Sequence, residues 1–314
     1  MFKKIQSKAI VAVALSLMLL LSACSTAPAK SNGASTSQDV SSVDNGTKTI
    51  STKLGDVEVP VNPQRIMVNY LQGDVLALGV QPSIVGFMQP GAVFESLMAE
   101  DTIILEDPRD REEVMAAEPD LIITANPDDF TEFEKIAPVV YIEYQAISLD
   151  ERLLFIGDVI GKQAEAEQLL KDYHQTLDEA KQTLTENGLY DSTVSVVMGD
   201  GSGGMIVRGN NWGISSTVYG VLGLHAPKLV EDTMFKEDKT ISMEVMHDYM
   251  GDYILYEPDN FDDILDSPIW ATLDAVTTQQ VATYDSTLAY FPDIYSVTKQ
   301  VEAITSTLLN LSKS

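Results

Sequence analysis

Few side chains in this 314-residue sequence have the types and spacing that chemistry requires. A single cysteine, Cys24, excludes an internal disulfide and a thiolate metal cluster. The three histidines, His174, His225 and His247, are scattered rather than clustered with carboxylates, so a free-metal site is not expected. Residues 199–204 read Gly-Asp-Gly-Ser-Gly-Gly, without the Lys-Ser/Thr ending of a phosphate loop or the strand–turn–helix context of a nucleophilic serine. We interpret this loop as a hairpin turn.

The charge balance also limits the function. The chain has 47 acidic residues against 20 Lys and Arg, a formal net charge of −27. Phosphate binding needs clustered cations, so nucleic acid is not an expected partner. The composition, with 45% hydrophobic and 21% charged residues, is that of a globular protein, and the length suggests about two domains. Any site that needs a guanidinium must use one of five arginines: Arg65, Arg109, Arg111, Arg152 and Arg208.

The N-terminus has the pattern of an export signal. Three lysines precede an apolar run at residues 10–21, which is short for a membrane span. The following Leu-Ser-Ala-Cys resembles a bacterial lipobox, which implies removal of residues 1–23 and a diacylglycerol thioether on Cys24. A plain secretory signal with an accidental cysteine is the alternative. Residues 24–52 are rich in Ser, Thr and Asn, which predicts a flexible tether to the extracellular face of the bacterial membrane.

Two similar stretches follow, at residues 53–160 and 189–314. Each alternates short apolar runs with helical patterns, which indicates βα units and a mainly parallel sheet. The expected strands are residues 66–70, 84–87, 121–124 and 139–142 in the first stretch, and 194–198, 205–207, 253–256 and 281–284 in the second. The expected helices between them are residues 74–78, 111–117, 215–222 and 243–249.

A long helix over residues 161–188 joins the two stretches. Apolar residues recur at spacings of three and four from Ala166 to Leu184, and Asn187-Gly188 is a good stop signal. About 26 residues would span ~40 Å. A coiled-coil arm is the alternative, but the apolar face lasts under four heptads. We therefore predict an α/β protein of two similar lobes with mainly parallel sheets, joined by one long α-helix.

An internal echo supports two equivalent lobes. The segment from Glu112 to residue 130 contains a helix start, an apolar strand and the loop Asn-Pro-Asp-Asp-Phe. The segment from Met243 to residue 261 repeats that order, ending in Glu-Pro-Asp-Asn-Phe, with spacings that differ by one residue. In α/β sheets the loop at the carboxyl end of a strand is where ligands bind.

Several pieces, in this order and after a lipobox, resemble one known family. They are Pro-Gln-Arg-Ile at 63–66, Asp-Val-Leu-Ala-Leu-Gly-Val at 74–80, Glu-Pro-Asp-Leu-Ile-Ile at 118–123, Ile-Ala-Pro at 136–138, Ile-Ser-Met-Glu at 241–244 and Ser-Pro-Ile-Trp at 267–270. From about residue 57 onward the chain resembles the substrate-binding lipoproteins of ABC importers for iron–siderophores, haem and cobalamin. The resemblance implies a class III periplasmic-binding-protein fold. It also implies a monomer that does no chemistry, holds iron only within its cargo, and delivers that cargo to a permease and its ATPase.

The resemblance further implies an acid on each lobe that docks on permease arginines. The matching positions are Glu112 and Glu244, with Glu113 as a near alternative. The other interpretation is that these are ordinary solvated helix acids.

The segment Asn-Asn-Trp-Gly at 210–213 looks like the hydroxamate-siderophore branch of the family, in which the Trp packs on the cargo and an Arg two residues later contacts hydroxamate oxygens. Here Ile214 occupies that Arg position, and Arg208 is the candidate replacement. A ferric trihydroxamate is neutral, whereas a ferric tricatecholate carries three negative charges and would need several cations. Because cations are few, a neutral chelate held by aromatic and thioether contacts is favoured. The predicted ligand contacts are Tyr70, Met88, Arg109, Arg208, Trp212, Tyr290 and Phe291.

Alternatives remain open at this point. The aromatic residues and Met88 could belong to the core, and Arg109 could pair with Asp107 or Asp110. A catecholate or carboxylate siderophore, haem or cobalamin are other cargoes, although none of the three histidines has a context typical of a haem ligand. An extracellular lipoprotein hydrolase is a remote alternative, since no carboxylate pair stands out in so acidic a chain.

Overall fold

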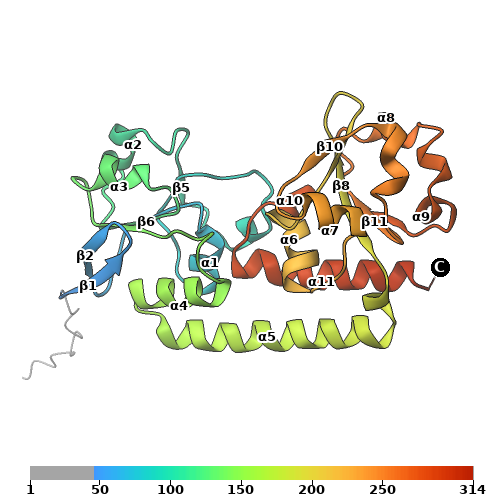
Figure 1. The fold of residues 1–314 in the computed structure, drawn as a ribbon. Coiled ribbons are helices and arrows are strands. Elements are labelled where there is room, and N and C mark those ends of the chain that lie inside the picture. Colours follow the sequence, from blue (N-terminus) through green and yellow to red (C-terminus); the bar gives the residue numbers. More distant parts are fainter. Residues whose placement is uncertain (1–45, 314) are drawn as a thin grey trace, which may run out of the picture. The chain divides into compact units, whose positions relative to one another are not determined.

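The structure is a computed structural model that describes residues 46–313. The predicted signal at 1–23, Cys24 and most of the tether lie outside the described residues. The described residues belong to one compact unit that contains two five-stranded sheets (Figure 1). Within residues 46–313, no helix is both long and apolar enough to cross a membrane.

The first sheet is parallel throughout and has the order β5-β4-β3-β6-β7. Its strands are β3 (Ile66–Asn69), β4 (Ile84–Val85), β5 (Ile103–Ile104), β6 (Leu121–Thr124) and β7 (Val139–Tyr141). Every residue of β3, β4 and β6 is buried, because helices cover a parallel sheet on both faces. The helical elements that follow these strands are α1 (Gln72–Ala77), η1 (Val93–Leu97), α2 (Arg111–Ala116), α3 (Asp128–Phe133) and α4 (Leu149–Val159).

The second sheet has the order β10-β9-β8-β11-β12. Its strands are β8 (Val194–Gly199), β9 (Met205–Val207), β10 (Lys239–Ile241), β11 (Tyr253–Tyr256) and β12 (Val281–Thr283). Three of them are parallel, whereas β9 and β10 run antiparallel to their neighbours. The predicted hairpin at residues 199–204 is confirmed, since it joins β8 to β9 and Asp200 accepts hydrogen bonds from the Ser202 and Gly204 amides.

Short helices surround the second sheet. They are η2 (Leu189–Asp191), α6 (Gly213–Ser216), the π-helical η3 (Thr217–Val221), α7 (Lys228–Met234), η4 (Met243–Asp248), α8 (Asp262–Leu265), η5 (Trp270–Thr272), α9 (Asp274–Thr277) and α10 (Ser286–Ala289). The last helix, α11 (Ile294–Leu311), is long and begins at the side-chain cap Asp293.

The predicted long helix is confirmed as α5 (Gln163–Glu186). Its 24 residues span ~36 Å at 1.5 Å per residue. Its buried face packs on α4 and along α11 (Figure 1). Gly188, with φ of 70°, ends it in the left-handed conformation that glycine adopts without strain.

One part of the tether prediction is wrong. Residues 47–52 form β1 (Thr47–Thr52), which pairs antiparallel with β2 (Gly55–Pro60). The strand is easily mistaken for a linker because Thr and Ser fill its exposed positions. Its one large apolar residue, Ile50, is buried with Val57 and Val59 of β2, and β1 lies against β7.

The internal echo corresponds to a structural repeat. β6 and β11 occupy positions 121–124 and 253–256, an offset of 132 residues. Just before them, Asp120 accepts hydrogen bonds from the Gln64 and Arg65 amides, and Asp252 accepts one from the Thr193 amide. Each lobe thus ties together the starts of two neighbouring strands, β3 with β6 and β8 with β11, in the same way.

Candidate functional site

The carboxyl ends of four strands of the first sheet surround a hollow of about 280 Å³. Tyr70 follows β3, Phe87 follows β4, Asn126 follows β6 and Tyr144 follows β7. The complete lining is Asn69, Tyr70, Phe87, Pro108, Arg109, Ala125, Asn126 and Tyr144. This is the sheet edge at which α/β folds place ligands, and the wall is mostly aromatic and amide in character.

Buried Asp129 holds the loops around this hollow together. Its carboxylate accepts hydrogen bonds from Asn69 Nδ2 at 2.7 Å, Thr124 Oγ1 at 2.5 Å and Asn126 Nδ2 at 2.9 Å. The Asn69 Oδ1 atom in turn accepts from the Phe87 amide at 3.0 Å. One carboxylate therefore connects the ends of β3, β4 and β6. Sequence reasoning missed Asp129 and Asn69, although the echoed Asn-Pro-Asp-Asp loop was the available signal.

Tyr70 is the strained member of the hollow. Its φ of 79° is a left-handed conformation that non-glycine residues seldom adopt and that is often found at functional sites. The turn aims its ring into the hollow, where its hydroxyl lies 3.5 Å from that of Tyr144. Burial, and then the hydrogen bond with Tyr144, raise the Tyr70 pKa far above its usual value. The phenol is therefore neutral and able to donate a hydrogen bond.

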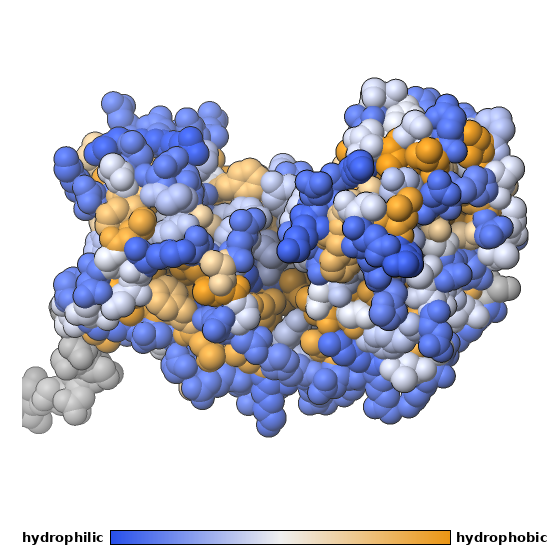
Figure 2. All heavy atoms as spheres, in the orientation of Figure 1, coloured by the Kyte–Doolittle hydropathy of each residue, from blue (hydrophilic) through white to orange (hydrophobic). Residues whose placement is uncertain are grey.

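A continuous series of aromatic contacts leads from this hollow to the second lobe. Tyr70 contacts Tyr144 at 5.1 Å and Phe291 at 5.7 Å between ring centroids. Phe87 stacks on Tyr290 at 5.9 Å, and Tyr290 meets Trp212 edge-on at 5.8 Å. The structure thus connects four of the predicted ligand contacts: Tyr70, Trp212, Tyr290 and Phe291. Figure 2 shows some hydrophobic residues in the depression between the two lobes, with mostly hydrophilic residues on the raised parts to either side.

The residues along this path differ in exposure. Phe291 is buried against Phe94, with centroids 4.8 Å apart, so it forms the floor beneath the surface residues. Met88 and Tyr290 are half-buried beside them. Trp212 is 44% exposed, which is unusual for so large an apolar ring and leaves a face open for a ligand.

The Arg208 guanidinium packs against the face of the Trp212 ring. Its guanidinium carbon lies 4.0 Å from the centre of the indole, and Nη2 donates to the Trp212 carbonyl oxygen at 3.4 Å. Nε lies 3.1 Å from Asp238 Oδ2, close enough for an ion pair but outside hydrogen-bonding geometry. The side chain is only 6% exposed, so its guanidinium contacts other protein groups rather than solvent. A direct contact with cargo stays a prediction. Ile214 is likewise buried.

Glu257 and Tyr284 lie at the carboxyl ends of β11 and β12, and sequence reasoning did not single them out. The Tyr284 hydroxyl donates to Glu257 Oε2 at 3.4 Å. Burial, followed by repulsion from Asp259, raises the Glu257 pKa above its usual value. The second sheet therefore has a half-buried acid, rather than a cation, at its carboxyl edge.

Cations at the candidate site are scarce. Arg109 lines the hollow and is exposed, and within residues 46–313 no carboxylate lies within ion-pair distance of it. Its backbone amide donates a hydrogen bond to Asp107 Oδ1, whereas its guanidinium has no hydrogen-bond partner among the described residues. The other four arginines are engaged: Arg65 with the Ala117 and Glu118 carbonyls, Arg111 with Glu132, Arg152 with Asp74 and Arg208 with Asp238.

The histidines lie apart from the aromatic path. His174 pairs with Asp150 at 2.6 Å, His225 with Glu231 at 3.5 Å, and His247 contacts the Thr272 hydroxyl at 3.0 Å. All three are exposed. Among the described residues there is no group of three His, Cys, Asp or Glu side chains placed to hold a metal ion.

A larger hollow of about 450 Å³ lies elsewhere, at the amino ends of β8, β11 and β12. Its walls include Thr193, His247, Asp252 and Gln280. Since ligands of α/β sheets bind at the carboxyl ends, and none of the predicted contacts lines this hollow, the aromatic path marks the better candidate site.

Comparison with known proteins agrees with this geometry. Residues 101–288 match the periplasmic binding protein family. Over 304 residues the chain is 30% identical to the iron(3+)-hydroxamate-binding protein YxeB of Bacillus subtilis, covering 93% of this chain and 94% of the relative. The chain belongs to the periplasmic binding protein family. The iron(3+)-hydroxamate-binding protein FhuD of the same organism is also 30% identical, over 94% of this chain and 95% of its own length.

Solved structures show the same fold. The FhuD protein from S. pseudintermedius has a TM-score of 0.70 and 24% identity, over 84% of this chain and 98% of that one. A FhuD fold-family component of a ferrichrome ABC transporter from Bacillus subtilis has a TM-score of 0.69 and 28% identity, over 82% and 98%. The predicted fold class is confirmed.

The predicted docking acids of this periplasmic binding protein lie at equivalent points of the repeat. Glu112 is in the first turn of α2 and Glu244 in the first turn of η4, 132 residues apart, as are β6 and β11. Both acids are exposed, and the residues two further on, Val114 and Met246, are both buried. This register pairs Glu244 with Glu112 rather than with Glu113. Docking itself stays a prediction.

Proposed function

We propose that this protein captures a ferric siderophore of the hydroxamate type between its two lobes and delivers it to an ABC permease. The observation that carries the proposal is the aromatic path from Tyr144 to Trp212, which has a single unengaged guanidinium, that of Arg109, beside it. The naming of two relatives as iron(3+)-hydroxamate-binding proteins supports the same cargo class.

The charges at the site favour a neutral chelate. Recognition of a trianionic ferric tricatecholate would require several charge-assisted donors, whereas four of the five arginines are already engaged within the described residues. The half-buried Glu257 would repel such an anion. A neutral complex loses little by leaving water, and aromatic rings cover its apolar surface. The phenol groups of Tyr70 and Tyr144 and the side-chain amide of Asn126 would donate to its oxygens.

The decisive experiment is a titration of the purified protein, monitored by tryptophan fluorescence. Ferrichrome and ferrioxamine B should quench the emission, and ferri-bacillibactin, staphyloferrin B, haemin and cobalamin should not. Trp212→Phe should abolish the quenching, whereas Trp270→Phe should preserve it, because Trp270 is buried in the second lobe against Phe261 at 5.3 Å. Saturable quenching by only the catecholate or carboxylate chelate would contradict the hydroxamate assignment.

We also propose that Cys24 carries the lipid that holds the protein at the extracellular face of the membrane. The support is the sequence pattern, because Cys24 lies outside the described residues. In cells, Cys24→Ser should move the protein from the membrane fraction to the medium. Retention of that variant in the membrane fraction would exclude the anchor.

A further inference from the structure

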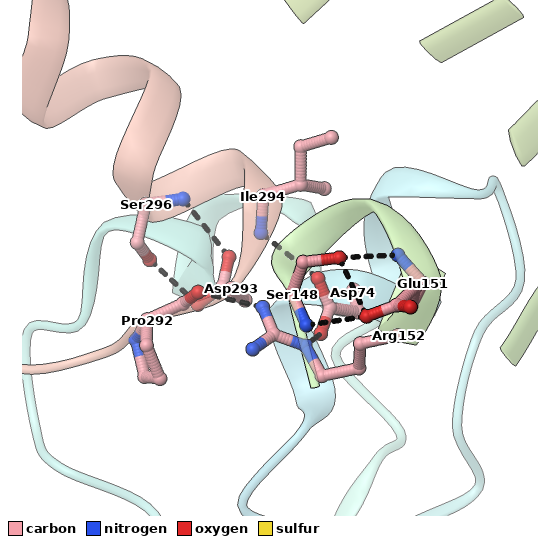
Figure 3. A network of polar contacts seen from close by, with 8 residues as sticks. All are labelled: Asp74, Ser148, Glu151, Arg152, Pro292, Asp293, Ile294 and Ser296. Carbon is pink, nitrogen blue, oxygen red and sulfur yellow. Dashed lines mark hydrogen bonds and ion pairs between the residues drawn. The ribbon is translucent and has the colours of Figure 1, made fainter. Parts of the chain in front are cut away.

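A buried charge cluster, drawn in Figure 3, joins α1 and α4 of the first lobe to the start of α11 in the second. Asp74 belongs to α1 of the first lobe and Arg152 to α4. Asp293 caps α11, which packs on α5 and closes the second lobe. The three side chains are 0%, 3% and 1% exposed, so none of their charges is solvated by bulk water.

The hydrogen bonds of the cluster cross between the lobes. Asp74 accepts from Arg152 Nε at 2.7 Å and from the Ile294 amide at 2.8 Å. Arg152 Nη2 donates to the Pro292 carbonyl oxygen at 2.6 Å. Asp293 accepts from the Ser296 amide at 2.9 Å and the Ser296 hydroxyl at 2.7 Å.

The packing is also tight where the two carboxylates approach each other. A Cβ atom on Gly73, the residue before Asp74, would collide with the Asp293 carboxyl group, so only glycine fits at that position. The segment that bears Asp293 also bears Tyr290 and Phe291, and Tyr70 lies four residues before Asp74. The cluster therefore fixes where the two halves of the aromatic path meet.

The charges of the cluster do not balance. Two carboxylates face one guanidinium, which leaves one buried negative charge if both are ionised. The other ionisable groups near Arg152 are the phenols Tyr70 and Tyr173, from the β3–α1 turn and α5. Burial raises both of their pKa values, that of Tyr173 to about 12, so both are neutral. The remaining carboxylate in Figure 3, Glu151, is exposed and held by Ser148.

We propose that Asp74, Arg152 and Asp293 form a proton-linked latch between the lobes, which is tightest when Asp293 carries a proton and which loosens when that proton leaves. Proton uptake removes the unbalanced charge while the Asp74–Arg152 pair stays intact. The latch positions the aromatic floor of the site, and it is independent of which cargo the site takes.

The direction of the pH effect follows from the burial of Asp293. Burial, and then repulsion from Asp74, raise the Asp293 pKa from 3.8 to about 6. The folded protein therefore retains a proton that the unfolded chain has lost between these two values. The resulting stabilisation is fully present below the unfolded pKa and is lost as the pH rises through about 6.

The test compares Asp293→Asn with the wild type by thermal unfolding at pH 4.5 and pH 7.5. Asparagine is as good an N-cap as aspartate, so the variant should fold with α11 intact. At pH 7.5 it should unfold at a temperature higher by about 5 °C, because it removes the unbalanced buried charge, and at pH 4.5 the difference should nearly vanish. Asp110→Asn, at the exposed N-cap of α2, is the matched control and should not raise the unfolding temperature at pH 7.5.

A second measurement reports on the latch alone. The Ile294 amide donates to Asp74, so its hydrogen-exchange protection factor, corrected for the intrinsic pH dependence of exchange, measures local opening. In the wild type this factor should fall several-fold from pH 5 to pH 7.5, and in Asp293→Asn it should stay constant. If Asp293→Asn instead lowers the unfolding temperature equally at both pH values, or if the Ile294 protection falls alike in both proteins, the latch is excluded and Asp293 is only a helix cap.

Discussion

At the scale of single residues, the site depends on side chains that never reach its surface. Asp129 organises three strand ends, Arg208 supports an exposed indole, and Phe291 lies beneath Tyr70. The residues that would touch the cargo are positioned by buried polar and aromatic neighbours, so mutations in this support should affect affinity as well as stability.

Replacing Asp129 with Ala should therefore be costly. It leaves buried donors on Asn69 and Thr124 without an acceptor, and we expect a loss of ~3 kcal/mol in the free energy of unfolding, measured by urea denaturation. Asp128→Ala is the control. Asp128 precedes Asp129 in the sequence but is exposed, so this variant should lose under ~0.5 kcal/mol of unfolding free energy. Equal losses of unfolding free energy in the two variants would show that the hydrogen bonds of Asp129 stabilise the fold no more than an exposed carboxylate does.

Tyr70→Phe tests the phenol directly. The ring contacts with Tyr144 and Phe291 remain, and only the hydroxyl group is lost, which accepts from the Tyr144 hydroxyl and would donate to the cargo. Ferrichrome affinity should fall about five-fold, in line with one lost hydrogen bond of ~1 kcal/mol, with little change in unfolding temperature. An unchanged dissociation constant would remove the Tyr70 hydroxyl from the set of cargo donors.

At the scale of elements, α5 connects the two lobes through one buried stripe. Leu184, near its carboxyl end, is fully buried, and its truncation to Ala should cost ~3 kcal/mol of unfolding free energy. Gln182→Ala, on the exposed face of the same turn, should cost almost nothing. If the two variants unfold at the same urea concentration, the helix is not anchored through this stripe.

The elements also show how far sequence reasoning reaches. The predicted bounds of β6, β9 and β11 coincide with the observed ones, because each strand is a short, mostly apolar run with Gly, Asp or other polar residues close to its ends. β1 was missed because only Ile50 points inward. The Asn69–Asp129 hydrogen bond and the Arg208–Asp238 ion pair could not be predicted, since each joins residues that are far apart in the sequence and meet only in the folded chain.

At the scale of the whole molecule, the repeat offers two equivalent acidic positions to a partner. If Glu112 and Glu244 dock on the permease, the double variant Glu112→Ala, Glu244→Ala should bind ferrichrome normally but reduce its cellular uptake at least ten-fold. Ser242 holds Glu244 and lowers its pKa, so its charge persists in mildly acidic medium. Glu113→Ala, on the same turn of α2, should leave uptake intact. Lost ferrichrome binding in the double variant would show that these acids are structural instead.

The hairpin of β1 and β2 protects the edge of the first sheet from other molecules that are crowded together on a surface. β7 ends the first sheet, and an uncovered end strand invites a second copy to add its own strand. β1 lies against that strand and buries Ile50 next to the core. A chain trimmed to begin after Pro60 would present the open strand to its neighbours, and it should self-associate at concentrations where the intact chain stays dispersed.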